Sequence, residues 1–177
     1  MSRDEHLQDP ETTPKEQAEL FGQARKIRFA MVTTRTHDGA LASRPMTLQE
    51  VDGDGTMWFF TSANTQLADD VTADSTVNVA FADKDDDFYL SASGDAQFVD
   101  DREKVEALWG MMAAAWFDGP TDPNLWLLRV RADRIDYWKA GAGKVLQLAS
   151  MAKAALTGTR PGKAVGEHGT FDPRSNS

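Results

Sequence analysis

Hydroxyl and amide side chains cluster where a strand rich in aromatic residues gives way to a short helix. This hydroxyl cluster consists of Thr61, Ser62, Asn64, Thr65 and Gln66. The first N–H groups of a helix have no acceptor within the helix and lie at its positive end, so they can bind a phosphate. The hydroxyls of Thr61, Ser62 and Thr65 would add further donors. The segment is therefore a candidate anion site.

The cation that such a site needs is supplied by Arg44, in the segment Ser43-Arg44-Pro45-Met46. If the strand that carries Arg44 pairs with the aromatic strand before the hydroxyl cluster, the guanidinium reaches the same end of the sheet and can clamp a phosphate. The alternative is that Thr61, Ser62 and Asn64 only cap the helix and that Arg44 is a solvated edge residue. Capping is the commoner use of these residue types.

A second candidate site lies further along the chain. Trp138 closes the last predicted strand, and a Gly-rich turn follows it as far as Lys144. An indole face beside a cation suits a planar, phosphate-bearing ligand. The alternative is that Trp138 lies in the core or in an interface between two copies, where tryptophan is more common.

The composition argues against several other functions. The chain of 177 residues has 28 acidic and 19 basic side chains and a net charge of -9, which disfavours nucleic acid and anionic lipid as partners. It contains no cysteine and three histidines, so we expect no metal site, and the acidic runs Asp69-Asp70 and Asp85-Asp86-Asp87 are interpreted as solvated turns. No stretch has the length and apolar character of a signal peptide or a membrane span, so we expect a cytoplasmic protein.

Short strands separated by turns make up most of the chain. Thr13-Pro14-Lys15-Glu16 predicts the start of a helix that ends near Arg28. The turn Asp38-Gly39 predicts a hairpin, and Gly94 indicates a bulge. The predicted strands cover residues 29–34, 40–48, 57–61, 76–81, 88–99, 125–130 and 134–138, the last two being either separate or one bent strand.

Two more helices are predicted. One is short and falls within residues 62–74. The other runs from Asp100-Asp101 to about Trp116, and its periodic residues are expected to be buried: Val105, Leu108, Trp109, Met112 and Trp116. Six or seven short antiparallel strands with helices outside favour a closed or half-closed barrel, since closure hides strand edges. The fold class is therefore mainly β (α+β).

The domain organisation follows from the same patterns. Residues 1–12 are polar and aperiodic and are expected to form a mobile N-terminal arm. Residues 13–148 form the barrel domain. Residues 149–177 are predicted to be a frayed, partly disordered C-terminal tail, because after residue 157 the chain is too polar to bury much.

Four segments, in this order, resemble the pyridoxamine 5'-phosphate oxidase-like flavoproteins, and within them the general stress protein 26 branch of the FMN-binding split barrels. The likeness covers residues 14–148. No one segment is diagnostic, but four in register on a β-rich chain make a fairly specific match. The segments are Ala30-Met31-Val32-Thr33-Thr34, Ser43-Arg44-Pro45-Met46, Trp58-Phe59-Phe60-Thr61 and Arg134-Ile135-Asp136-Tyr137-Trp138.

The resemblance implies a six-stranded antiparallel split β-barrel with flanking helices. It further implies a homodimer with two FMN molecules in clefts at the interface. Arg44 and the segment Thr61–Gln66 would hold the ribityl phosphate, and Pro45 and Met46 would line the isoalloxazine ring. Trp138 and the turn up to Lys144 would approach the flavin from the other subunit. The implied cofactor-binding residues are thus Arg44, Pro45, Met46, Thr61, Ser62, Thr65, Gln66, Trp138 and Lys144.

Two departures from the family pattern bear on function. Family members usually have Lys, which pairs with the FMN phosphate, where this chain has Leu67. Losing a charged hydrogen bond costs about 1.5–3 kcal/mol, or roughly ten- to a hundredfold in affinity. The neutral residues Leu146, Gln147 and Leu148 replace the basic residues that hold a pyridoxamine substrate, so vitamin B6 oxidation is not predicted.

Three functions remain in competition. The first is an FMN-dependent oxidoreductase of unknown substrate, in which the flavin carries the electrons. The second is a flavin-binding stress protein without turnover, and the third is a dimeric barrel that has lost the cofactor. The sequence contains no Ser-His-Asp or Cys-His set, and it identifies no catalytic residue.

Overall fold

The structure is a computed structural model that describes residues 12–139 and 167–175. In this part of the chain the elements are α1 (Pro14–Ile27), β1 (Phe29–Arg35), β2 (Leu41–Val51), β3 (Thr56–Ser62), α2 (Gln66–Ala73), β4 (Thr76–Asp83), β5 (Phe88–Val99), α3 (Arg102–Leu108), α4 (Met111–Ala114), β6 (Leu125–Lys139) and β7 (Glu167–Phe171).

The strands form one antiparallel sheet in the order β3-β2-β1-β4-β5-β6-β7. A further pairing of β3 with β6 closes the first six strands into a barrel, and β7 is added at the edge of β6. The prediction of a mainly β, six-stranded antiparallel barrel with flanking helices is confirmed. Closure pairs the outer strands with each other, so no strand of the six is left with a free edge over its full length.

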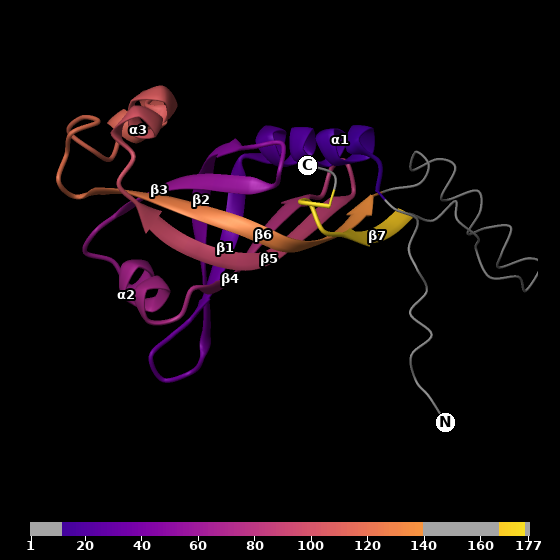
Figure 1. The fold of residues 1–177 in the computed structure, drawn as a ribbon, viewed down its shortest axis with the longest axis horizontal. Helices are drawn as coiled ribbons and strands as arrows, with labels where there is room; N and C mark the ends of the chain where they lie inside the picture. Colours follow the sequence, from indigo (N-terminus) through magenta and orange to yellow (C-terminus); the bar gives the residue numbers. More distant parts are fainter. Residues whose placement is uncertain (1–11, 140–166, 176–177) are drawn as a thin grey trace, which may run out of the picture.

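Helix α1 starts where the sequence predicts. The side chain of Thr13 accepts a hydrogen bond from the backbone N–H of Glu16, whose carboxylate in turn accepts from the N–H of Thr13 at 2.8 Å. This reciprocal pair is a capping box. One side of the helix, with Leu20 and Phe21, is buried in the main core, and the helix lies along the outside of the sheet (Figure 1).

The two longest strands, β5 and β6, pair along most of their length. The register shifts between Ser93 and Gly94, as the predicted bulge requires. A Cβ at Gly94 would lie 2.0 Å from the carbonyl oxygen of Arg131, so only glycine fits there. Residues 125–139 form one continuous strand, which is the second of the two alternatives for this segment.

The helix predicted to reach Trp116 is wrong in its second half. Trp109 adopts an extended conformation (φ -63°, ψ 130°) and, with Gly110, separates α3 from the short α4. Glycine is a poor helix former, which accounts for the interruption at this point. Val105 is buried, whereas Met112 and Trp116 are 37% and 82% exposed, so the expected buried stripe is not formed.

The prediction of a frayed tail is wrong for residues 167–175. Strand β7 pairs with the end of β6, and Phe171 is buried against Phe21 and Tyr137. Gln17 donates to the carbonyl oxygen of Pro173 at 2.9 Å. The segment is polar overall, but strand pairing, the buried ring of Phe171 and the hydrogen bond from Gln17 attach it to the barrel. The arm over residues 1–11 and the tail residues 149–166 and 176–177 lie outside the described residues.

Two clusters of apolar side chains hold the barrel together. The larger one fills its interior, and its most deeply buried members include Met57, Phe59 and Leu128. The smaller one lies on the outer face of β3 and β6, where Trp58 and Leu127 pack against Val105 of α3. The second cluster explains why α3 stays attached to the sheet although it has only seven residues.

Candidate functional site

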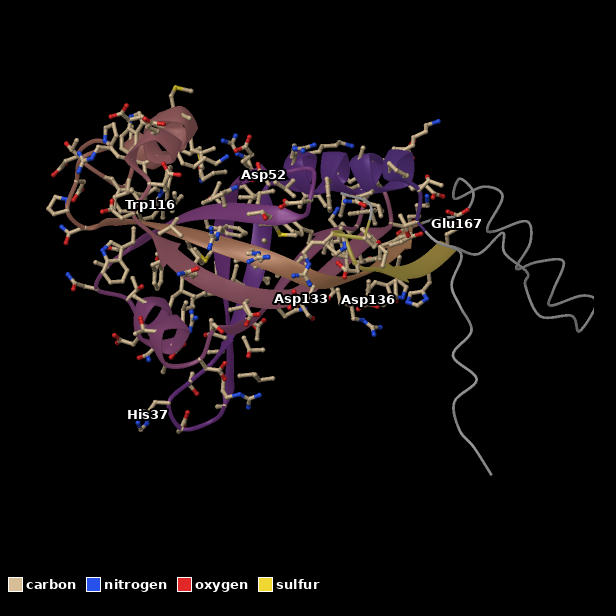
Figure 2. All side chains as sticks on the ribbon, viewed as in Figure 1. His37, Asp52, Trp116, Asp133, Asp136 and Glu167 are labelled. Carbon is tan, nitrogen blue, oxygen red and sulfur yellow. The ribbon has the colours of Figure 1, made fainter. Side chains whose placement is uncertain are left out.

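A cavity of about 580 Å³ lies beside the hairpin of β2 and β3. Its wall consists of Phe29 of β1, residues 44–47 and 49 of β2, residues 60–62 of β3, Thr65 and Leu67 at the start of α2, and residues 112, 113, 116 and 117 in and after α4. Figure 2 shows Trp116 at the end of the molecule that carries α3. Both the hairpin and two helices that cover different parts of the sheet are therefore needed to form the cavity.

Six of the predicted flavin-binding residues line this one cavity: Arg44, Pro45, Met46, Thr61, Ser62 and Thr65. They come from three elements, and they meet because β2 and β3 pair as an antiparallel hairpin, with Leu48 opposite Phe59. This is the pairing on which the sequence argument depended.

The helix is capped by Thr65, and not by Thr61, Ser62 or Asn64 as the capping alternative expected. Thr65 is the N-cap of α2, where its Oγ1 accepts from the backbone N–H of Ala68 at 3.3 Å and donates to the carbonyl oxygen of Ser62 at 3.0 Å. It also lies on the cavity wall. Helix capping and a place on the cavity therefore do not exclude each other.

Arg44 is not a solvated edge residue. Its Nη1 donates to Oγ1 of Thr34 at 2.7 Å, and its Nη2 donates to Oδ2 of Asp70 at 3.1 Å. The side chain of Asp70 is 1% exposed and that of Arg44 is 24% exposed. The guanidinium is thus held on one side by β1 and α2, and its remaining surface contributes to the cavity.

The carboxylate of Asp70 collects three hydrogen bonds. Besides Arg44, it accepts from Oγ1 of Thr34 at 2.7 Å and from Nε2 of Gln66 at 2.9 Å. Burial raises the pKa of Asp70, but the hydrogen bonds from Gln66, Thr34 and Arg44 together outweigh it and hold the pKa below its ordinary value. Asp70 therefore remains an anion at neutral pH. Its assignment to a solvated turn is wrong.

Two more predicted residues, Gln66 and Trp138, are described by the structure and do not line the cavity. Gln66 is exposed, and its amide is bound to Asp70. Trp138 is 44% exposed near the end of β6, where its ring lies 5.1 Å from that of His168, and it forms no part of this cavity within one chain. Lys144 lies outside the described residues.

Several lining residues were missed by the sequence argument. They are Phe29, Thr47, Gln49, Phe60, Met112, Ala113 and Phe117, together with Trp116, which was expected to be buried in the core. The residues of α4 reach the cavity only because the helix breaks at Gly110, and no local pattern indicates where a separated helix will settle. The sequence contains a weak indication that Asp70 takes part, because it follows Gln66 by one helical turn and the two side chains can therefore meet.

The cavity combines apolar walls with hydroxyl groups and a single cation. Arg44 is the only charged side chain among the described lining residues, which include no histidine or carboxylate. Within residues 12–139 and 167–175, no group of three histidines, cysteines or carboxylates is placed to hold a metal ion. None of the helices described there has the length and apolar character to cross a membrane. The arrangement suits a ligand with a flat apolar part and a polar tail.

The fold and the cavity together define a small antiparallel barrel with a ligand cavity beside its β2–β3 hairpin. A family model described as pyridoxamine 5'-phosphate oxidase like matches residues 15–162. The chain belongs to this family, as its four sequence segments predicted.

Individual relatives agree with this assignment. The protein bli-3 of Neurospora crassa is 30% identical over 142 residues, which cover 74% of this chain and 68% of that protein. A structure assigned to general stress protein 26 of Jannaschia sp. CCS1 has a TM-score of 0.71 at 28% identity, covering 88% of this chain and 96% of that one. A general stress FMN/FAD binding protein of Xanthomonas citri has a TM-score of 0.63 at 35% identity, covering 72% and 90%.

Proposed function

We propose that the protein binds FMN in the cavity beside β2 and β3 and acts as a flavin-dependent oxidoreductase. The observation that carries the proposal is that six predicted flavin-binding residues, from three separate elements, line one cavity. Its volume of about 580 Å³ lies within the usual range of cofactor sites. The Xanthomonas citri relative, described as an FMN/FAD binding protein, supports the same ligand class.

The residues of the cavity fit the parts of a flavin. Pro45 and Met46 offer apolar surface for the ring, and the hydroxyls of Thr61, Ser62 and Thr65 suit the polar ribityl chain. Arg44 is the group that can donate to a phosphate. A bound flavin would supply the electron transfer, while the protein orients it and excludes water. The electron donor and the substrate are not identified by these residues.

We also propose that the protein is a homodimer with its cofactor clefts at the interface. Residues that pair across antiparallel strands lie on the same face of the sheet, and so do residues two apart in one strand. Met31 pairs with Ala80, and Ala80 pairs with Ser91. Tyr89, two residues before Ser91, pairs with Trp138, so Met31, Tyr89 and Trp138 share the outer face. Met31, Tyr89 and Trp138 are 43%, 43% and 44% exposed in the single chain. Sedimentation equilibrium tests this proposal, and a monomer at micromolar concentration would contradict it.

The first experiment is to purify the protein, add FMN, remove free flavin by ultrafiltration and count the flavin retained per chain. One flavin per chain supports binding, and oxidation of NADH or NADPH by the loaded protein supports an oxidoreductase. Retained flavin without turnover with any pyridine nucleotide favours the non-catalytic flavin-binding stress protein. A colourless protein favours a barrel that has lost the cofactor.

Two arginines on neighbouring strands make a matched pair of variants for this experiment. Arg44→Gln removes the cation of the cavity and should lower flavin retention. Arg35→Gln removes an arginine whose side chain is 54% exposed and pairs with Asp74 at 3.4 Å, away from the cavity wall. It should retain flavin as the unmodified protein does. An equal loss in both variants would place the flavin elsewhere.

A further inference from the structure

The cation of the cavity is already paired within the protein. Nη2 of Arg44 donates to Asp70 at 3.1 Å, and Asp70 is almost completely buried, so the pair is shielded from solvent. Close pairing of opposite charges leaves little net field for a third charged group. Arg44 therefore presents hydrogen-bond donors to the cavity without an unbalanced positive charge.

The surroundings add no second cation. Among the described residues that line the cavity, Arg44 is the only charged one, and Leu67 occupies the first turn of α2. Asp69 lies exposed in the same turn of α2. Its negative charge partly cancels the positive end of the helix dipole, which would otherwise attract an anion. Arg44 and Asp70 together sum to a net charge of zero at this side of the cavity.

We propose that Asp70, by neutralising Arg44, makes this cavity a receptor for the ring and ribityl chain of a flavin, in which a dianionic phosphate contributes little affinity. The inference rests on the proposed flavin binding and specifies it further: riboflavin and FMN are bound with similar strength. Asp70 is a positioning residue, because it acts on the ligand through Arg44.

The hydrogen-bonding groups of the cavity agree with this preference. The ribityl chain is neutral and has several hydroxyls, and the cavity offers it the side chains of Gln49, Thr61 and Ser62. A dianion, by contrast, requires full charges to replace its hydration. Here it would approach a neutral ion pair.

The test is to titrate the protein with FMN and with riboflavin, following the quenching of flavin fluorescence. For the unmodified protein we expect the two dissociation constants to agree within about tenfold. Asp70→Asn keeps an oxygen that can accept from Arg44 but removes the charge, so it should shift the affinity ratio toward FMN by about tenfold. Asp69→Asn removes the same charge from an exposed neighbour and should change the ratio by less than about threefold.

A second measurement does not depend on the folding of a variant with a substituted buried carboxylate. The second pKa of a phosphate monoester is about 6, so FMN loses most of its second charge between pH 7.5 and 5.5. If the cavity does not favour the dianion, FMN keeps or gains affinity relative to riboflavin over this range.

The charged groups that act on Asp70 are Arg44 of β2, its chain neighbour Asp69 and Asp38 of the β1–β2 turn. Asp74, the C-cap of α2, is paired with Arg35 of β1. These side chains do not ordinarily titrate over this pH range. His37 lies at the tip of the same hairpin (Figure 2), and the pH series is run in a His37→Gln background so that this side chain makes no contribution.

Three results would overturn the inference. The first is FMN binding more than tenfold tighter than riboflavin in the unmodified protein, or weakening relative to riboflavin as the pH falls. The second is an equal effect of Asp70→Asn on both flavins, which would show a purely structural role. In these cases the proposed flavin binding stands. The third is binding of neither flavin, which would overturn the proposed function as well.

Discussion

Leu67 of α2 and Arg44 of β2 line the same cavity from two different elements. Leu67 is 2% exposed and also belongs to the main core. The position at which family members usually have a lysine therefore faces the candidate ligand site. Leu67 forms part of the cavity wall and also packs in the core of the barrel.

We predict that Leu67→Lys raises the affinity for FMN about ten- to a hundredfold, because a charged hydrogen bond contributes about 1.5–3 kcal/mol. The affinity for riboflavin should stay nearly constant. The lost packing should lower the free energy of unfolding by about 1–3 kcal/mol. Calorimetric titration measures the first effect and urea unfolding the second. Leu67→Met serves as the uncharged control, and no gain for FMN in the lysine variant would mean that no phosphate lies near residue 67.

Gly94 should tolerate no side chain. A Cβ there would lie 2.0 Å from the carbonyl oxygen of Arg131, so β5 and β6 would have to separate at the bulge. We expect Gly94→Ala to lower the free energy of unfolding by about 3 kcal/mol or more. Gly22 of α1 has free space around its Cα, and Gly22→Ala should instead stabilise the protein by about 0.5–1 kcal/mol. Urea unfolding of both variants is the measurement; equal stabilities would show that the bulge can adapt.

Lys104 attaches α3 to the β2–β3 hairpin. It forms an ion pair with Glu50, lies 3.6 Å from Asp52 and stands 4.8 Å from the ring centre of Trp58. We expect Lys104→Gln to lower the free energy of unfolding by about 1–2 kcal/mol. Lys84→Gln, which removes an exposed ion pair with Asp85, should have almost no effect and is the matched control.

The stabilisation that Lys104 provides should decrease at alkaline pH. Burial lowers the pKa of Lys104, but its contacts with Glu50 and Asp52 outweigh this and leave the pKa above the ordinary value of 10.5. The stabilisation is therefore complete below pH 10.5 and disappears as the pH rises through the higher folded-state value. Unfolding measured at pH 8 and in the alkaline range should show the difference between Lys104→Gln and the unmodified protein shrinking. A constant difference would contradict the ion pairing.

The stabilisation that Asp70 provides should be lost at acid pH, whereas that of Lys104 is lost at alkaline pH. Its pKa is held below the ordinary value of 3.8, so its stabilisation is present above pH 3.8 and is lost as the pH falls through the lower folded-state value. We expect Asp70→Asn to be less stable than the unmodified protein at neutral pH and to lose less stability on acidification below pH 3.8. Asp69→Asn should follow the unmodified protein. Urea unfolding over the acid range is the measurement, and parallel curves for Asp70→Asn would contradict it.

Phe171 should be the anchor of β7. Its ring centre lies 6.5 Å from that of Phe21 and 6.2 Å from that of Tyr137. We predict that Phe171→Ala lowers the free energy of unfolding by about 3 kcal/mol, whereas His168→Ala on the exposed side of the same strand changes it little. Limited proteolysis should then cut the segment after residue 166 in the first variant only. Resistance in both variants would mean that backbone pairing alone holds β7.

Several local features were predictable from the sequence because they depend on neighbouring residues. The capping box of Thr13 and Glu16, the hairpin turn at Gly39 and the N-cap at Thr65 all form between residues at most a few positions apart. The positive φ of Gly39, 84°, is a conformation that glycine alone adopts without strain. The four segments of the resemblance added the flavin as the expected ligand and Pro45 and Met46 as residues that line its ring.

What the amino-acid sequence by itself determined, then, is most of the elements up to residue 139, the barrel class and the residues able to bind an anion. Only the tertiary structure decided that Arg44 meets Asp70, that α4 forms a wall of the cavity and that β7 joins the sheet. These three features depend on contacts between distant parts of the chain. Such contacts form where burial and charge pairing outweigh local preference, and local patterns do not encode them.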